Sequence, residues 1–239
     1  MKELSIVIPI LNEAKNINQL IPEINKIKKK IRLNRLEVLL IDDNSHDNIK
    51  NVVTRLRKKY SYLKLFIRKN KKKDLSKSCI EGFNKTKYKN ILVMDGDLQH
   101  PPQYIEKMYN VFINQKCDFV IGSRDLLKRK NYGLSKIRKL FSIILIFIIN
   151  LLLGNKTRDP MSGFFIFKKE IFKNNKNQLF SSGYKILSDL IYSSKERLKI
   201  KDVPIRFDQR NSGKSKMNLS ILIILIYFIL TKFINKNNT

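Results

Sequence analysis

The sequence predicts an α/β fold in which a mostly parallel sheet is flanked by helices. Three observations lead to this prediction: short apolar runs recur between turn residues, segments of helical period separate them, and polar residues follow the runs. The chain has 239 residues, of which 43% are hydrophobic and 29% charged, enough for one such domain with modest appendages. This composition excludes a wholly disordered, collagen-like or multi-span membrane chain.

Five apolar runs are predicted to be buried strands, because each is short and bounded by turn residues. In chain order they are Leu4–Ile10, Leu36–Ile41, Leu63–Ile67, Ile91–Met94 and Phe119–Ile121. The clearest helix lies between the first two runs, where Ile and Leu recur at intervals of three and four from Ile17 to Ile31. Ser45 and Asp47 are expected to cap the helix that follows them.

Polar side chains follow four of the predicted strands. They are Asn12 and Glu13, Asp42 and Asp43, Asp95 and Asp97, and Ser123 and Arg124. Ligands of such sheets bind beyond the carboxyl ends of the strands, so these groups are expected to share one crevice. Any one acidic pair is compatible with a turn or a helix cap, but the four strand ends together indicate a site.

The segment from Met94 to Pro102 places two carboxylates, Asp95 and Asp97, two residues apart at a strand end. Hard cations such as Mg²⁺ and Mn²⁺ bind one or two carboxylates together with phosphate oxygens, and Gln99 adds a carbonyl oxygen. We therefore expect a metal site at Asp95, Asp97 and Gln99 that neutralises a leaving diphosphate. An isolated pair of this spacing is common by chance, so the expectation depends on the neighbouring strand ends.

Several motifs occur in an order and spacing typical of one family. They are SIVIPILNE, LLIDDNSHD, DLSKSCIEGF, ILVMDGDLQHPP, FVIGSR, RDPMSGFF, GYKILSDL and RNSGKSKMN. From Leu4 to Met217 the chain resembles inverting family 2 glycosyltransferases of the GT-A fold, and among them the dolichol-phosphate (polyprenyl-phosphate) mannosyltransferases. The resemblance implies mannosyl transfer from GDP-mannose to a dolichyl or polyprenyl phosphate. Transfer from UDP-glucose or another nucleotide sugar is the alternative.

The resemblance also implies roles for single residues. The nucleotide pocket would be lined by Pro9, Leu11, Glu13, Ile41 and Asp43. The metal and the sugar diphosphate would be held by Asp95, Gly96, Asp97 and Gln99. Phosphates of donor or acceptor would be met by Arg124, Arg138, Arg210 and Lys216, the last two from a loop that closes over the donor, while Ser162 would border the acceptor. The catalytic groups would be Asp95, Asp97, Arg124 and Arg210.

Three positions depart from the family pattern. Leu11 replaces an aromatic residue, Asn44 replaces a usual Gly, and Asp74 stands where many relatives have Gly. The change at Leu11 removes a stacking or hydroxyl contact, which bears on base recognition and so on GDP against UDP. Asp189, on a predicted helix, is left without a role.

The chain carries 49 Lys and Arg against 20 Asp and Glu, a formal charge of +29. The excess favours an anionic partner, and because no RNA- or DNA-binding motif is present, a membrane surface or phosphorylated substrate is favoured over nucleic acid. Cys79 and Cys117 are too few and too distant for a disulfide framework and are expected to be reduced packing residues. His46 and His100 are expected to be structural.

Two apolar stretches, Leu140–Leu153 and Leu219–Leu230, carry Lys and Arg on their flanks, Lys232 among them. Both are shorter than the roughly 20 residues that cross a bilayer, and basic flanks suit an anionic cytoplasmic leaflet. A crossing by the first stretch would separate Asp95 from Asp159, so we expect helices that lie in the membrane interface. Buried core helices are the alternative.

These features predict a catalytic domain over residues 1–217, with an interfacial helix at 140–153, and a membrane-associating tail over 218–239. The tail is a surface anchor, a short tilted span or a docking helix for a small membrane partner subunit, and the sequence leaves these three open. The first residues, MKELSIVIPI, enter a strand-like run without a signal-peptide pattern. We therefore expect the protein at the cytoplasmic face of the membrane.

Overall fold

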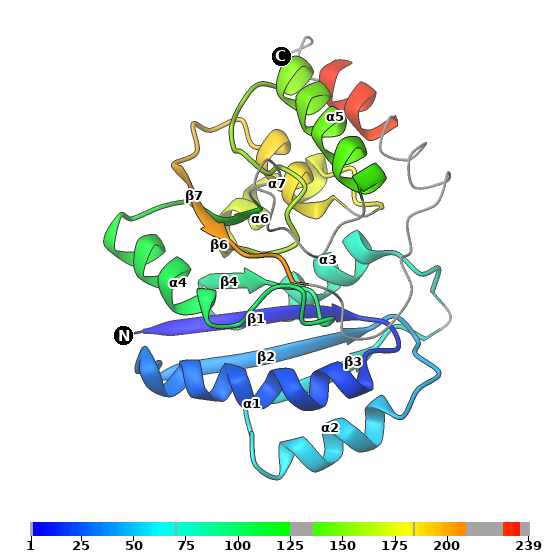
Figure 1. Cartoon of the computed structure of the whole chain (residues 1–239), viewed down its shortest axis with the longest axis vertical. Helices are drawn as coiled ribbons and strands as arrows, with labels where there is room; N and C mark the ends of the chain where they lie inside the picture. Colours follow the sequence, from blue (N-terminus) through cyan, green and yellow to red (C-terminus); the bar gives the residue numbers. More distant parts are fainter. Residues whose placement is uncertain (1, 70, 125–135, 184, 209–226, 235–239) are drawn as a thin grey trace.

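The computed structural model describes residues 2–69, 71–124, 136–183, 185–208 and 227–234, with the backbone alone described in residues 136–142. Its centre is a seven-stranded sheet in the order β3-β2-β1-β4-β6-β5-β7 (Figure 1). The strands are β1 (Glu3–Ile10), β2 (Arg35–Asp42), β3 (Leu63–Ile67), β4 (Asn90–Val93), β5 (Phe119–Arg124), β6 (Phe165–Lys168) and β7 (Ile200–Ile205). All pairings are parallel except those of β6, which runs antiparallel to β4 and β5.

The helices follow the strands along most of the chain. They are α1 (Ala14–Lys30), α2 (Ile49–Arg57), α3 (Leu75–Lys85), α4 (Tyr104–Asn114), α5 (Lys136–Leu153), α6 (Lys169–Asn175) and α7 (Ile186–Ser193), with the 3-10 turn η1 (Lys176–Gln178). Residues 227–234 are also helical and are called the C-terminal helical segment below. The predicted fold class is confirmed.

Helices cover both faces of the sheet, as the side chains of β1 show, because they point alternately to one face and the other. Ile6 and Ile8 pack in one buried cluster with residues of α1, α2 and α4, whereas Val7 between them packs with α3. A strand that is buried on both faces reads as a continuous apolar run, which is why β1, β2, β4 and β5 were predictable. β3, at the edge of the sheet, is only partly buried, but its residues are still mostly apolar. Because β1, β2 and β3 are parallel, the helices that follow them, α1, α2 and α3, begin at the carboxyl edge of the sheet.

Two strands lack this signal and were not predicted. β6 has four residues and continues directly into α6, so its apolar run is too short to stand out. β7 lies at the edge of the sheet, alternates buried and more exposed residues, and contains Pro204. Proline is tolerated in edge strands because one side of the backbone makes no ladder bonds.

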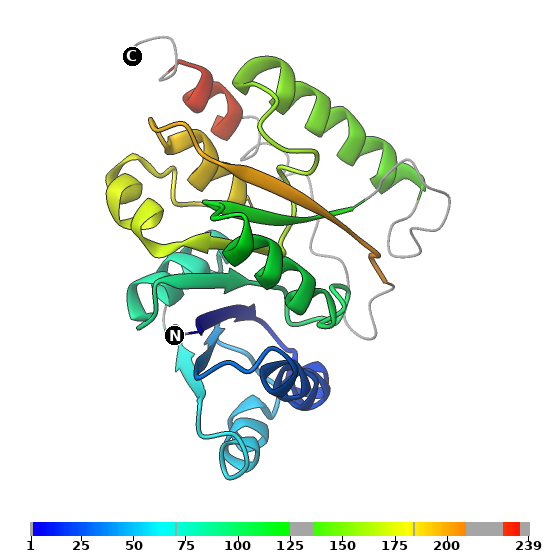
Figure 2. The same ribbon diagram turned by 90° about the vertical axis from the view of Figure 1, so that its left-hand side faces the viewer.

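α5 and the C-terminal helical segment lie side by side (Figures 1 and 2). Leu145, Ile149 and Leu153 of α5 form a third buried cluster with Phe228 and Ile229. The stretch predicted at 140–153 is thus helical and partly a core helix. Among the described residues, no helix combines the length and apolar character that crossing a membrane requires.

Lys232 does not flank the second apolar stretch in the predicted way. Its ammonium group is buried and pairs with Asp189 Oδ1 at 2.8 Å, with side chains 5% and 3% exposed. The expectation of a membrane-facing Lys232 is therefore wrong, because the helix turns this side chain into the protein.

Candidate active site

The loops after β1 and β2 are tied to each other at the carboxyl edge of the sheet. The Asn12 N–H donates to Ser45 Oγ at 2.8 Å, and the Ala14 N–H, at the start of α1, donates to Asp47 Oδ2 at 2.8 Å. The expectation that Ser45 and Asp47 cap the following helix is wrong. That helix begins after Asn48 without a side-chain cap bond, because both side chains serve the neighbouring loop.

Asp43, expected to line the nucleotide pocket, is held at the end of β2 by two separate segments of the chain. Arg68, which directly follows β3, donates to Asp43 Oδ1 at 2.5 Å, and the Asp74 N–H donates to Oδ2 at 2.7 Å. Burial raises the pKa of Asp43 above its usual value, although the Asp74 N–H and Arg68 oppose the shift. The next residue, Asn44, has a φ of 62°, which fits a position where the resembled family usually has glycine.

The other residues expected in the nucleotide pocket lie at the same edge. Pro9 of β1 and Ile41 of β2 are partners in register, and both are buried. Leu11 is half-buried, and Glu13 accepts a hydrogen bond from Asn16 Nδ2 at 2.6 Å. The ends of β1 and β2 therefore bring the expected pocket residues to one edge of the sheet, where the Asp43 N–H donates to the carbonyl oxygen of Ile10 at 2.9 Å.

Asp95 and Asp97, the expected metal ligands, follow β4. The Asp95 side chain is 34% exposed, whereas Asp97 is 3% exposed and its Oδ1 accepts from the Gln99 N–H at 3.1 Å. Gln99 Nε2 donates to the carbonyl oxygen of Asp208 at 3.1 Å, which fixes the orientation of the amide. At Gly96 a Cβ would lie 2.9 Å from a methyl group of Ile10, so glycine lets this turn pack against β1.

The RDPMSGFF segment packs directly against the first of these carboxylates. A Cβ at Gly163 would lie 2.7 Å from Asp95 Oδ2, a contact that real Cβ atoms do not make. Ser162, expected to border the acceptor, donates through Oγ to the carbonyl oxygen of Gly122 at 2.7 Å and so ties the turn to β5. The predicted donor and acceptor sides of the crevice meet at this glycine.

His100 is buried beside the same carboxylate. Its ring lies 5.3 Å from that of Phe164 and 5.2 Å from that of Phe207, and its Nδ1 is 3.7 Å from Asp95 Oδ2. Burial lowers the pKa of His100 to about 4, so the ring is neutral near pH 7. The neutral imidazole of His100 therefore holds the turn after β4 in place by packing against these two rings, and it adds no charge to the site.

Arg124 and Asp159 form a bidentate ion pair, with Nε to Oδ2 at 2.7 Å and Nη2 to Oδ1 at 2.9 Å. Their side chains are 10% and 0% exposed. Burial by itself would lower the pKa of Arg124 and raise that of Asp159, but the pairing reverses both shifts. A guanidinium has five N–H donors, so this pair leaves others for a phosphate group.

Sequence reasoning missed two cations of the crevice. Arg68 directly follows the third predicted strand, so the strand-end rule that selected Asp43 would also have selected it. Lys185 stands in the GYKILSDL motif, within electrostatic range of Arg124, Asp159 and Asp95. Burial, and then the charge of Arg124, lower the pKa of Lys185 to about 8.

Three expected phosphate-binding residues are not placed. The side chain of Arg138, on α5, lies outside the described residues, as do Arg210 and Lys216 altogether. The described crevice therefore contains Arg124 from the predicted basic set, together with Lys185 and Arg68.

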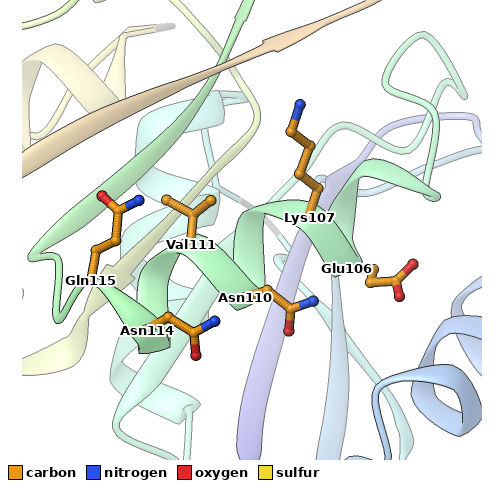
Figure 3. A pocket seen from close by; sticks show the side chains of 6 residues that line it. All are labelled: Glu106, Lys107, Asn110, Val111, Asn114 and Gln115. Carbon is orange, nitrogen blue, oxygen red and sulfur yellow. The ribbon is translucent and has the colours of Figure 1, made fainter.

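A pocket of about 360 Å³ lies along α4, away from these groups (Figure 3). Its lining residues are Glu106, Lys107, Asn110, Val111, Asn114 and Gln115. None of the predicted site residues lines it. In the part of the chain that the structure describes, no three His, Cys, Asp or Glu side chains form a metal-binding group. A cation at Asp95 and Asp97 would thus take further ligands from substrate or water.

Residues 5–175 match the family described as Glycosyl transferase family 2. The chain belongs to glycosyl transferase family 2. The match includes the ends of β1, β2, β4 and β5 and the RDPMSGFF segment, so it contains most of the crevice. The predicted family and the predicted class of enzyme, a glycosyltransferase, are confirmed.

This family 2 chain is similar to proteins named dolichol-phosphate mannosyltransferase. It is 34% identical to one from Pyrococcus furiosus over 90% of this chain and 59% of that protein. It is 27% identical to one from Saccharomyces cerevisiae over 92% of this chain and 83% of that protein. The chain thus spans less than two thirds of the Pyrococcus relative and most of the yeast one.

The fold is also that of a solved glycosyltransferase. Glucosyl-3-phosphoglycerate synthase from Mycobacterium tuberculosis, crystallised with Mn²⁺, UDP-glucose and phosphoglyceric acid, aligns with a TM-score of 0.70. The alignment covers 97% of this chain and 80% of that one at 17% identity. This likeness confirms the predicted GT-A architecture.

Proposed function

We propose that this family 2 chain transfers mannose from GDP-mannose to a dolichyl or polyprenyl monophosphate at the cytoplasmic face of a membrane. The observation that carries the proposal is the contact between Gly163 and the Asp95 carboxylate, because it joins the acceptor-side motif to the donor-side motif. The names of the Pyrococcus and Saccharomyces relatives support the same substrates.

The crevice fits a divalent cation by the chemistry of its donor groups. Asp95 presents a partly exposed carboxylate, Asp97 lies two residues on, and the amide of Gln99 is held beside them. Mg²⁺ and Mn²⁺ accept such oxygen ligands and complete their shells with phosphate and water. Bound there, either ion would neutralise charge that develops on the leaving nucleotide diphosphate.

The protein groups act by positioning and by charge. A lipid phosphate is already anionic near neutral pH, so its attack on the sugar C1 atom needs little help from a general base. Arg124, oriented by Asp159, would hold one phosphate group, and Lys185 adds a second cation beside it. A single displacement forms the C1–O(phosphate) bond, breaks the bond to the diphosphate and inverts the anomeric centre.

The remaining expected residues complete this site in the proposal. Donor contacts are assigned to Pro9, Leu11, Glu13, Ile41, Asp43 and Gly96, and further phosphate contacts to Arg138, Arg210 and Lys216, with Ser162 bordering the acceptor. The catalytic domain would comprise residues 1–217, and residues 218–239 would associate with the membrane or with a small membrane partner subunit. Nucleic acid is not proposed as a partner.

An apolar face supports the membrane assignment. It is formed by α5 and the C-terminal helical segment and consists of Ile144, Phe147, Leu151, Tyr227, Leu230 and Ile234, which are 44 to 69% exposed. The spacing of three and four residues places each set on one side of its helix. A lipid surface suits this face because the chain carries a charge of +29, which attracts anionic headgroups.

The transfer reaction is tested with labelled GDP-mannose and UDP-glucose in parallel, polyprenyl phosphate, Mg²⁺ or Mn²⁺, and organic extraction. We expect label in the lipid phase from GDP-mannose, abolished by EDTA. Label from UDP-glucose alone would overturn the sugar and keep the mechanism. No transfer from either donor to the lipid would overturn the proposal.

The apolar face is tested by flotation with vesicles of phosphatidylcholine containing about 30% anionic phosphatidylglycerol. The variant Phe147→Asp/Leu151→Asp should lose about tenfold or more in vesicle binding, because each charge must leave water. Ile113→Asp is the matched control, since Ile113 is also an exposed apolar residue, at 41%, but lies on α4. Equal losses in both variants would contradict the assignment of the face.

A further inference from the structure

The C-terminal helical segment is attached to the domain by a buried ammonium group. Lys232 Nζ pairs with Asp189 Oδ1 at 2.8 Å and also donates to Ser193 Oγ at 2.5 Å and to the carbonyl oxygen of Gln178 at 2.8 Å. An ammonium group has three donors, so all of them are used. Any shift of the segment would leave a buried charge unpaired, which is costly, so the contact sets the position of the segment on α7.

Asp189 also holds the backbone that precedes α7. Its Oδ1 accepts from the Phe180 N–H at 2.9 Å, and its Oδ2 accepts from the Ser181 N–H at 2.9 Å. The carboxylate thus joins the C-terminal helical segment to residues 179–183. Ser181 has a left-handed φ of 59°, so the backbone turns at this residue.

The far end of residues 179–183 holds the start of α3. Ser182 Oγ and the Gly183 N–H both donate to Asp74 Oδ2, at 2.9 and 2.8 Å. The other oxygen of Asp74 accepts from the Lys77 N–H at 2.9 Å as the cap of α3. In return, the Ser76 N–H donates to the carbonyl oxygen of Gly183 at 2.9 Å.

Asp74 in turn fixes the orientation of the Asp43 carboxylate. The Asp74 N–H donates to Asp43 Oδ2 at 2.7 Å, while Arg68 donates to Asp43 Oδ1 and to the Asp74 carbonyl oxygen, at 2.5 and 3.2 Å. Asp43 is 6% exposed and Asp74 is 9% exposed, so solvent screens these bonds little. Polar contacts, linked through the backbone of residues 181–182, therefore connect the C-terminal helical segment to the nucleotide end of the sheet.

We propose that Lys232, Asp189 and Asp74 are positioning residues for the nucleotide site, and that the C-terminal helical segment controls donor affinity through them. The inference rests on the proposed function, because it takes Asp43 as a nucleotide contact. It gives a role to Asp74 and Asp189. It also connects the apolar face to the donor site, since the segment that carries Tyr227, Leu230 and Ile234 is the one that Lys232 fixes.

The first test measures the dissociation constants of GDP and UDP, each with Mn²⁺, by calorimetry without acceptor. Lys232→Met and Asp74→Asn should each raise the dissociation constant of the nucleotide that the wild type binds by about 5- to 20-fold, the range of a modest coupling between sites. Asp74→Asn keeps an oxygen for the Lys77 N–H but cannot accept from Ser182 and Gly183. Lys168→Met, which removes a half-buried ion pair with Asp118 at 2.7 Å, is the control and should leave affinity unchanged.

The double variant separates one connected path from two independent defects. If Lys232 and Asp74 act through the same contacts, Lys232→Met/Asp74→Asn should bind nucleotide no more weakly than the worse single variant. Multiplying losses would overturn the connection. With saturating acceptor and varied donor, both single variants should raise the donor KM and leave kcat within about twofold, since they do not touch the reacting atoms.

Amide hydrogen exchange tests the same path without any ligand, so its outcome does not depend on the proposed reaction. In Lys232→Met the amides of Ser181, Asp74 and Lys77 should exchange at least about fivefold faster than in the wild type, while those of α2 keep their rates. Unchanged exchange at Asp74 and Lys77 would overturn the inference even if mannosyl transfer is established. Faster exchange together with failure of the transfer assay would overturn only the proposed reaction.

Discussion

The two sides of the crevice are held in different ways. On the donor wall (Asp42, Asp43, Arg68 and Asp74) each carboxylate is bound by backbone N–H groups, hydroxyl groups or one arginine from a neighbouring loop. On the transfer wall (Asp95, Asp97, Arg124 and Asp159) the bidentate Arg124–Asp159 ion pair is joined by backbone bonds from the Gln99 N–H to Asp97 and from the Arg124 N–H to Asp159. On the donor wall most of these bonds come from uncharged groups of neighbouring loops, whereas the transfer wall contains a buried bidentate ion pair.

This difference relates to what each wall is proposed to do. Recognition of a nucleotide needs fixed acceptors and donors, which backbone bonds provide without reorganisation. Transfer of a sugar between two phosphate groups requires that their negative charges be compensated. The transfer wall provides a positive charge in Arg124 of the buried pair with Asp159, and a negative charge in the partly exposed Asp95 carboxylate, which is proposed to bind a cation. Substitutions that alter charge should therefore act mainly through the transfer wall, and the following predictions test that expectation.

The largest effect is expected from Asp97→Asn. Removal of this charge at the proposed cation site should lower kcat by about 10²- to 10³-fold, as loss of a main electrostatic group does, and leave the melting temperature nearly unchanged. The assay is mannosyl transfer at saturating donor with Mn²⁺. Glu106→Gln on α4 is the control and should keep wild-type kcat, because Glu106 lines the pocket of Figure 3 and not the crevice. Comparable values of kcat in Asp97→Asn and wild type would show that Asp97 is not part of the proposed cation site.

The second prediction concerns the Arg124–Asp159 pair. Asp159→Asn leaves the guanidinium buried without its counter-charge, so the free energy of unfolding should fall by about 3 kcal/mol. Urea unfolding followed by circular dichroism measures it. The comparison variant Asp118→Asn breaks the half-buried pair with Lys168 and should cost about 1 kcal/mol. Equal losses would show that burial of the pair adds nothing to the stability of the transfer wall.

A third substitution displaces Asp95 without changing its charge. In Gly163→Ala the added Cβ would lie 2.7 Å from Asp95 Oδ2, so the carboxylate must move. We expect kcat to fall about tenfold or more, because small displacements in a site have large kinetic effects, while donor KM changes little. Gly154→Ala is the control: Gly154 has a φ of 93° but no atoms near an added Cβ, so the variant should lose stability and keep kcat. Equal kcat in Gly163→Ala and wild type would contradict the contact.

How much of the site could be predicted from the sequence depends on whether a residue stands at a strand end or is a distant partner of one. Strand ends are visible in a sequence because buried strands are continuous apolar runs, so Asp43, Asp95 and Arg124 could be assigned to one crevice. The partners of these residues could not be assigned in that way. Asp159 lies 35 residues from Arg124 and Asp189 lies 43 residues from Lys232 in the numbering, and local patterns carry no record of such pairing.

The predictions of a helix cap and of a membrane-flanking charge were wrong for a related reason. Ser45 and Asp47 precede a helix and so match a capping pattern, but both accept hydrogen bonds from the Asn12 and Ala14 N–H groups of the adjacent loop after β1. Lys232 follows an apolar run and so matches a membrane flank, but α7 offers it a buried carboxylate. In both cases a tertiary partner replaced the local one.

The smallest effect is expected at the opposite end of the sheet, where Glu37 belongs to neither wall. Its carboxylate accepts from Ser5 Oγ, Lys64 Nζ and the Lys87 N–H at 2.7, 2.7 and 2.5 Å. Burial alone would raise the pKa of Glu37, but these hydrogen bonds outweigh burial and hold the pKa below its ordinary value. Glu37→Gln should therefore lower the free energy of unfolding at pH 7 by about 1 kcal/mol and leave kcat unchanged.

The pH dependence of this loss follows from the sign of the shift. Because the pKa of Glu37 is lower in the folded chain, its contribution is complete above the unfolded-state value of about 4.3 and disappears as the pH falls through the folded-state value. The difference between wild type and Glu37→Gln, measured by urea unfolding, should thus be constant from pH 7 to pH 5 and shrink below about pH 4. Glu23→Gln, which removes an exposed pair with Lys26, should change stability by less than about 0.5 kcal/mol throughout. A difference for Glu37→Gln that persists unchanged in acid would mean that packing, and not the charge of this carboxylate, stabilises that end of the sheet.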